Sequence, residues 1–157
     1  MIRTAVLSFL SLLLITGCSK NNNNNTPSGS LSATVGGTSY TGTTTLGAYS
    51  SSLRLIAIVS YSIQVRDTSA FQIIIPYAPP VNRAFVSDSM YLTYTAKGTE
   101  YDAFSARGQL QMTITSIDSI GHKIAGNFSA IAHDSTNFND SLLITNGKFS
   151  TSYTVNP

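Results

Sequence analysis

Apolar and polar residues alternate with a period of two along most of this chain, and this pattern constrains the fold more than any other feature. In residues 110–115 (LQMTIT) every second residue is apolar, and residues 90–95 (MYLTYT) show a similar alternation. A β-strand places such residues on one face, whereas an α-helix spreads them around its axis. After residue 18 no segment keeps the period of an amphipathic helix. The sequence therefore predicts an all-β chain.

The longest alternating run covers residues 53–65 (LRLIAIVSYSIQV), in which every odd position is apolar. These odd positions are expected to face the core, with a bulge or bend near Ser60, because the run is long for one strand. Ile56 and Ile58 break the alternation, as does Ile74 in the next run. On the expected outer faces, these three side chains indicate a second covered face, an interface, or the inner cavity of a barrel.

Short turn signals separate the runs. Gly36 and Gly37 predict a tight hairpin turn, and Asn146 with Gly147 predicts a hairpin or a bulge. Strands joined by short turns form antiparallel sheets, which hide one face by packing on a second sheet or by closing. We expect a single domain over residues 31–157. Its predicted fold is an antiparallel β-sandwich of about nine or ten strands, with a closed β-barrel as the alternative.

The N-terminus carries the features of an export signal. Arg3 precedes the apolar segment 5–15 (AVLSFLSLLLI), which has the length of a signal peptide and is too short to span a bilayer permanently. The end of this segment resembles a lipobox, the motif cleaved by lipoprotein signal peptidase: Ile15, Thr16, Gly17 and Cys18. We expect removal of residues 1–17 and acylation of Cys18, with palmitate among the acyl chains. An ordinary cleaved signal with an incidental cysteine is the alternative.

Cys18 is the only cysteine, so a disulfide within one molecule is excluded and a catalytic thiol is not expected. Two or more acyl chains hold a protein firmly on a membrane. Ser19 follows the cysteine, as in lipoproteins of the outer membrane. Both the periplasmic and the outer side of that membrane are compatible with the sequence. Residues 18–30 are rich in Asn and are expected to form a flexible tether, because they cannot bury enough apolar surface to offset their ordering entropy.

The charge pattern narrows the function. Charged residues make up 10% of the chain, and the formal net charge is +2. Without a basic run, nucleic acid is not an expected partner, and no cofactor is expected. The expected partner is a membrane of the cell envelope, in which the N-terminal lipid is inserted. The sequence identifies no ligand or protein partner. We expect a non-catalytic binding or structural domain; the alternatives are a small envelope hydrolase and a barrel-type carrier of an apolar molecule.

Four short motifs follow one another along the chain: residues 32–40 (SATVGGTSY), 108–115 (GQLQMTIT), 124–129 (IAGNFS) and 144–149 (ITNGKF). In this order they resemble the TAxxNGxxW, SGxVTIT, ISGTFSF and ITNGxF segments of a family of small all-β bacterial outer-membrane lipoproteins of unknown function. Tyr40 replaces the usual Trp of that family, and Arg107 replaces the Ser before the glycine. The resemblance implies an all-β lipoprotein and assigns no catalytic residue.

Few residues are suited to acid–base catalysis. His133 beside Asp134 is one candidate, but neighbouring strand residues point to opposite faces, so the pair is interpreted as the entry to a loop. Glu100 and Asp102 would share one face of a strand, about 6–7 Å apart, near the carboxyl separation used in glycoside hydrolysis. A turn expected here, and the lack of Trp in the chain, argue against that role.

Two further groups are candidates for binding. An oxygen-rich loop offers ligands for a hard cation such as Ca²⁺, namely Asp134, Asn137, Asn139 and Asp140. The loop lacks the spacing and glycine of an EF-hand, so a polar hairpin loop without metal is favoured. Tyr77 and Tyr91 lie on either side of a proline-containing loop and are candidates for an exposed ligand-binding patch. Rings that simply cover a sheet edge are the alternative.

Overall fold

The structure, a computed structural model, describes residues 29–63 and 68–156. Within these residues the chain is all-β, as predicted, with one 3₁₀ turn, η2 (Ser105–Arg107), and no helix long and apolar enough to cross a bilayer. The strands in chain order are β1 (Ser30–Val35), β2 (Thr38–Thr41), β3 (Thr44–Ser50), β4 (Leu55–Ile63), β5 (Thr68–Pro76), β6 (Ala84–Phe85), β7 (Tyr91–Ala96), β8 (Thr99–Phe104), β9 (Leu110–Asp118), β10 (Lys123–Asp134) and β11 (Ser141–Asn156). The predicted signal peptide, Cys18 and nearly all of the predicted tether lie outside the described residues.

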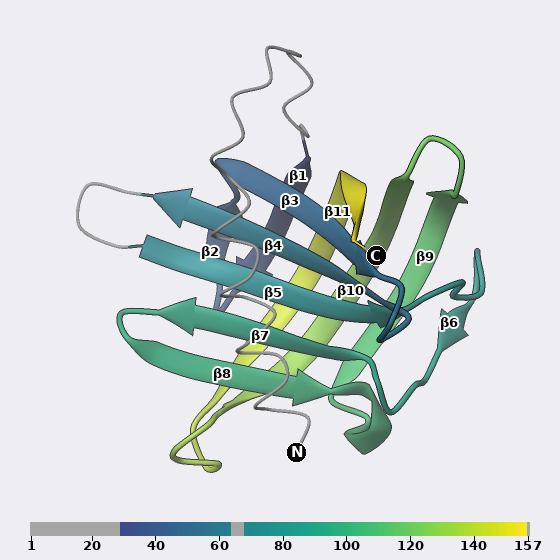
Figure 1. Cartoon of the computed structure of the whole chain (residues 1–157). Coiled ribbons are helices and arrows are strands. Elements are labelled where there is room, and N and C mark those ends of the chain that lie inside the picture. Colours follow the sequence, from purple (N-terminus) through teal and green to yellow (C-terminus); the bar gives the residue numbers. More distant parts are fainter. Residues whose placement is uncertain (1–28, 64–67, 157) are drawn as a thin grey trace.

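The eleven described strands form one hydrogen-bonded sheet in the order β2-β1-β11-β3-β4-β5-β7-β8-β10-β9-β6, with β11 also paired to β10. Figure 1 shows that this sheet is folded into two layers. Strands β3, β4, β5, β7 and β8 cross in front of β1, β11, β10 and β9. The inner faces of both layers meet in one apolar core. The arrangement is sandwich-like, as predicted, with slightly more strands than expected.

Hydrogen bonds join the two layers at both sides. On one side, β11 pairs with β10 and β1 and then, from Tyr153 onward, runs parallel to β3. On the other side, β8 meets β10 through two register pairs, Asp102 with His133 and Tyr101 with Asp134. The expectation of a purely antiparallel sheet is therefore wrong at the β11–β3 pairing. This pairing arises because β11 continues past the back layer and reaches the edge of the front one.

Strand β4 presents the opposite face to the core from the one predicted. Ile56 and Ile58 are fully buried in the core, whereas Ala57 and Val59 are buried outside the core cluster and Ile63 is 69% exposed. The predicted bulge near Ser60 is also wrong, because β4 pairs in continuous register with both β3 and β5. Two of the three side chains that suggested a barrel-type carrier, Ile56 and Ile58, are therefore core residues, whereas Ile74 keeps its expected outer position.

Two other sequence signals have clear outcomes. Ile74 does lie on the outer face, opposite the core residues Ile73 and Ile75, and it is buried there. The Asn146 and Gly147 signal forms a bulge within β11: Phe128 pairs with Gly147, and the register then shifts along the two strands. Asn146 adopts a positive φ of 53°, which Asn tolerates better than most residues.

Candidate functional site

A cleft of about 490 Å³ opens at one end of the two layers. Three chain segments surround it: the β1–β2 hairpin, the adjoining ends of β4 and β5, and the β7–β8 turn. Figure 1 shows these segments together at the left side of the molecule. Leu142, near the start of β11, adds an apolar side chain to the lining. The volume falls within the range of small-molecule binding sites.

Aromatic side chains form the inner wall of the cleft. Tyr40 and Tyr94 line it, and both are buried. Their ring centroids are 6.2 Å apart, and each ring packs on Phe71 of the core with a centroid distance of 4.8 Å. The contacts of Tyr40 with Phe71 and Tyr94 are edge-to-face, and that of Phe71 with Tyr94 is tilted, so the three rings hold one another in a fixed orientation. The inner wall is thus continuous with the core and preorganised.

A hydrogen-bond chain fixes Tyr40. Its hydroxyl donates to the backbone oxygen of Ser60 over 2.9 Å, and the Ser60 hydroxyl shares a bond of 2.9 Å with the Thr45 hydroxyl. Burial raises the pKa of Tyr40 to about 12, so its phenol stays protonated at neutral pH. These bonds also explain why Ser60 faces the core, since a buried hydroxyl is tolerated when it is hydrogen-bonded.

Short hydroxyl side chains surround the mouth. They come from β2, the ends of β4 and β5, and the start of β8: Thr38, Ser39, Ser62, Thr68, Ser69 and Thr99. Two tight turns complete the rim, and their central residues adopt positive φ: Gly36, Gly37, Lys97 and Gly98. A hydroxyl both donates and accepts hydrogen bonds. The mouth therefore offers many exchangeable hydrogen bonds around a small opening.

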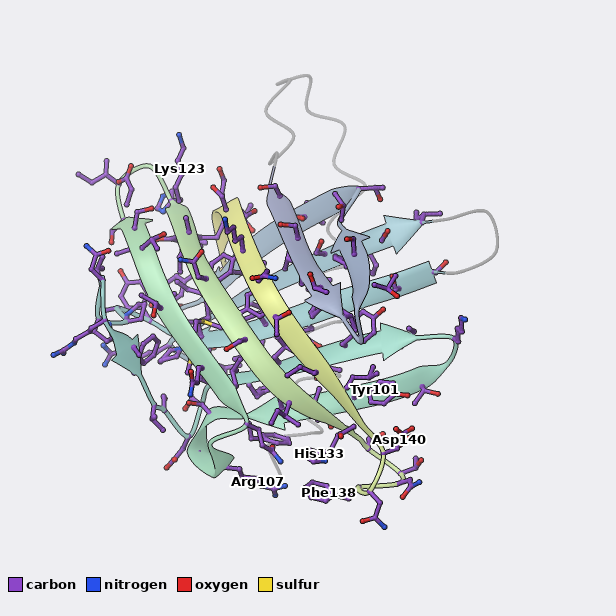
Figure 2. All side chains as sticks on the ribbon, turned by 180° about the vertical axis from the view of Figure 1, so that it is seen from behind. Tyr101, Arg107, Lys123, His133, Phe138 and Asp140 are labelled. Atoms are coloured by element: carbon purple, nitrogen blue, oxygen red, sulfur yellow. The ribbon has the colours of Figure 1, made fainter. Side chains whose placement is uncertain are left out.

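Tyr101 forms a side wall. Burial raises the pKa of Tyr101, and the negative charges of Asp140 and Asp134 raise it further. Its phenol is hydrogen-bonded to the Asp140 carboxylate, and Figure 2 shows the two side chains close together. Among the described lining residues, the only charged side chain is that of Lys97, and no carboxylate, imidazole or thiol is present. The cleft can therefore form hydrogen bonds and aromatic contacts, but its described walls hold no general acid–base pair.

The catalytic candidates lie elsewhere. Glu100 and Asp102 share the outer face of β8, as predicted from their spacing, and Thr93 donates a hydrogen bond of 2.8 Å to Asp102. His133 lies opposite Asp102 in the β8–β10 register, which sequence reasoning did not foresee because the two strands are distant in the chain. The His133 ring stacks on Phe138 at 4.1 Å, and its Nδ1 lies 2.9 Å from the Phe138 carbonyl oxygen. None of these side chains lines the cleft.

The oxygen-rich loop that holds the candidate cation ligands has the hydrogen bonding of a turn. The Asp134 carboxylate accepts hydrogen bonds from the backbone N–H and hydroxyl of Thr136, at 2.6 and 2.7 Å, and from the Asn137 N–H at 3.1 Å. Asp140 in turn donates its N–H to the Asn137 carbonyl. No group of three metal-ligating His, Cys, Asp or Glu side chains occurs in residues 29–63 and 68–156. Asn139 also belongs to this exposed loop.

Tyr77 and Tyr91 do not come together. Tyr77 stacks on Tyr49 with a centroid distance of 4.4 Å and packs against the core. Tyr91 lies on the outer face of β7, and its nearest aromatic neighbour is Phe104 at 6.0 Å. The Tyr91 hydroxyl is buried and has no hydrogen-bond partner in the described part of the chain. Tyr77 and Tyr91, the two candidates for a ligand-binding patch, therefore do not share one surface.

Sequence reasoning missed the residues that line the cleft. The positions of the turns could have indicated part of the cleft, because alternate turns of an antiparallel sheet lie at the same end of the sheet. Only the register shows that the Gly36 and Lys97 turns meet there. Comparison with known protein families, curated proteins and solved structures found no match. The family resemblance inferred from the four motifs therefore stays a prediction.

Proposed function

We propose that this protein is a lipid-anchored lipoprotein of the bacterial cell envelope whose β-domain binds a small ligand in the cleft without transforming it. The observation that supports this proposal best is the chemistry of the cleft. Its described walls combine aromatic rings, hydroxyls and one amine, without a carboxylate or imidazole to move protons. The protonated state of Tyr40, whose pKa is about 12, fits binding better than acid–base chemistry at neutral pH.

The position of the cleft agrees with tethering. The described part of β1 starts at Ser30, which pairs with Ser150, and ends at Val35, which lines the cleft. Val35 lies five residue steps along the strand from Ser30, or about 17 Å at the usual rise. The cleft thus opens at the end of β1 away from the segment that we propose to be the tether, and in that orientation a membrane leaves it accessible.

A variant that fills the cleft tests the binding function. Thr68→Trp places an indole at the exposed rim of the cleft, and Thr115→Trp places one on the exposed surface of β9, outside it. We expect ligands that raise the melting temperature of the wild-type lipoprotein to raise that of Thr115→Trp equally and to have no effect on Thr68→Trp. Ligand-induced stabilisation that survives in Thr68→Trp would place binding elsewhere.

Fatty-acid labelling tests the anchor. In cells fed radiolabelled palmitate, the wild-type chain should take up label and fractionate with membranes, whereas Cys18→Ala should do neither. Release of the wild-type protein from membranes by salt alone, or label retained in Cys18→Ala, would contradict the lipid anchor.

A hydrolase is the second candidate, because the register brings His133 opposite Asp102. Side chains at such paired positions have Cβ atoms about 4.5–5.5 Å apart. Asp102→Asn and His133→Ala should then abolish turnover of ester or glycoside substrates, while Thr68→Trp leaves it intact. Absence of turnover in the wild-type protein removes this candidate.

A further inference from the structure

We infer that the ligand of the cleft is a neutral saccharide of one or two sugar units. This inference rests on the binding function proposed above and specifies its ligand. The first argument is the density of hydroxyls at the mouth, where the Ser and Thr side chains come from β2, β4, β5 and β8. Each of them can donate and accept, as can each hydroxyl of a sugar, so a sugar can replace the water that these groups would otherwise bind.

The second argument is the aromatic inner wall. Tyr40 and Tyr94 are held at a centroid distance of 6.2 Å by their contacts with Phe71. A sugar ring has an apolar face of C–H groups and a polar edge of hydroxyls, and tyrosine offers the matching combination of an apolar body and a polar tip. An alkyl chain would match the rings but would leave the surrounding hydroxyls without partners, at a cost of about 1–3 kcal/mol for each one buried.

The third argument is charge. Lys97 is the only charged side chain among the described lining residues, and it belongs to the exposed turn at the rim. Tyr101, on the strand that follows the Lys97 turn, is hydrogen-bonded to the Asp140 carboxylate, which does not line the cleft. The positive charge of Lys97 is thus accompanied by a negative charge near the same hairpin, and within the Debye length of about 8–10 Å the two oppose each other's attraction for an ion. A neutral ligand fits this balance better than an acidic one.

Calorimetric titration of the purified lipoprotein in detergent tests the inference. The neutral probes are maltose, cellobiose and N,N′-diacetylchitobiose, and the comparison probes are glucuronate, octanoate and the tripeptide Ala-Ala-Ala. We expect at least one neutral disaccharide to bind. Thr68→Val and Thr99→Val, which each remove one hydroxyl of the mouth, should each weaken it about 3- to 10-fold, whereas Thr115→Val on β9 should leave its affinity unchanged.

The outcomes separate the two proposals. Binding of octanoate, glucuronate or the tripeptide, lost in Thr68→Trp, with no binding of the neutral sugars, overturns the saccharide inference and leaves the binding function standing. Equal affinity of a disaccharide for wild type, Thr68→Val and Thr99→Val also overturns the inference, because the mouth then does not contact the sugar. If none of the probes binds and no ligand-induced stabilisation is lost in Thr68→Trp, both proposals fail.

Discussion

The hydroxyl of Tyr40 on β2 donates a hydrogen bond to the backbone oxygen of Ser60 on β4, 2.9 Å away. These two strands belong to different layers, so the bond crosses the core at the inner end of the cleft. It fixes the Tyr40 ring where a ligand would contact it. The same residue therefore contributes to the stability of the fold and to the shape of the candidate site.

Tyr40→Phe removes this bond and keeps the ring. We expect the free energy of unfolding to fall by about 1 kcal/mol, the usual net contribution of one hydrogen bond. Urea denaturation measures the change, with Tyr61→Phe as a matched control, since Tyr61 lies on the other face of β4. Equal stability of Tyr40→Phe and wild type would show that the bond adds nothing in solution.

Gly147→Ala should be destabilising because the bulge in β11 brings the Phe128 backbone and ring against this glycine. A methyl group there would lie 2.6 Å from both the ring and the carbonyl oxygen of Phe128. We expect a loss of about 1–3 kcal/mol, as for other overpacked positions. Gly121→Ala is the control, because its methyl would meet only the Asp118 carboxylate, which accepts the Gly121 N–H but belongs to an exposed side chain, so a smaller loss is expected. Similar denaturation midpoints for both variants would contradict the close packing.

Tyr153→Ala should strongly destabilise the protein. Tyr153 is buried in the core and contacts Tyr49 and His122, at the point where β11 begins to pair with β3. Truncation of a buried aromatic side chain costs about 3–5 kcal/mol. Val155→Ala on the same strand serves as the control, because Val155 is 47% exposed. Thermal unfolding of the two variants should differ clearly, and similar melting temperatures would argue against a structural role for this end of β11.

The loop between β10 and β11 should make a contribution to the stability of the fold that is lost in acid. The Thr136 hydroxyl and backbone N–H hold the pKa of Asp134 below its ordinary value of 3.8. A pKa that is lower in the folded state stabilises the fold above the unfolded-state value, and this stabilisation is lost as the pH falls through the folded-state value. In Thr136→Val the pKa of Asp134 should return toward 3.8, as followed by ¹³C NMR of the carboxylate. Thr154→Val should leave the titration unchanged, and an unshifted curve in Thr136→Val would contradict the assignment.

The alternation pattern predicted the all-β class and most buried positions correctly. Leu110, Met112 and Ile114, the apolar residues of the alternating segment 110–115, all face the core, because burial removes their apolar surface from water. The pattern failed at β4, where Ser60 and Ser62 occupy the inner face. A sequence cannot distinguish a hydroxyl that faces water from one that accepts a bond from a distant residue such as Tyr40.

The candidate site was much harder to predict. Its wall residues come from segments that are far apart in the chain, namely the β1–β2 hairpin, the ends of β4 and β5, and the β7–β8 turn. Their meeting depends on the register of the strands between them. Tyr77 and Tyr91 are nearer in sequence, but they lie on opposite faces of the front layer. Conversely, His133 and Asp102 are neighbours only because β8 pairs with β10. Residues close in the sequence were therefore apart in the structure, and residues distant in the sequence were neighbours.

The place of β11 in the sheet has a consequence for how the molecule assembles. The first described strand finds its main partner in the last one, since Ser30 pairs with Ser150. A ribosome that releases the N-terminal end first therefore exposes β1 long before β11 has been synthesised. Closing so long a loop is slow and entropically costly. Central hairpins such as β4–β5 are free to form early, whereas completion of the sheet awaits the final residues of β11.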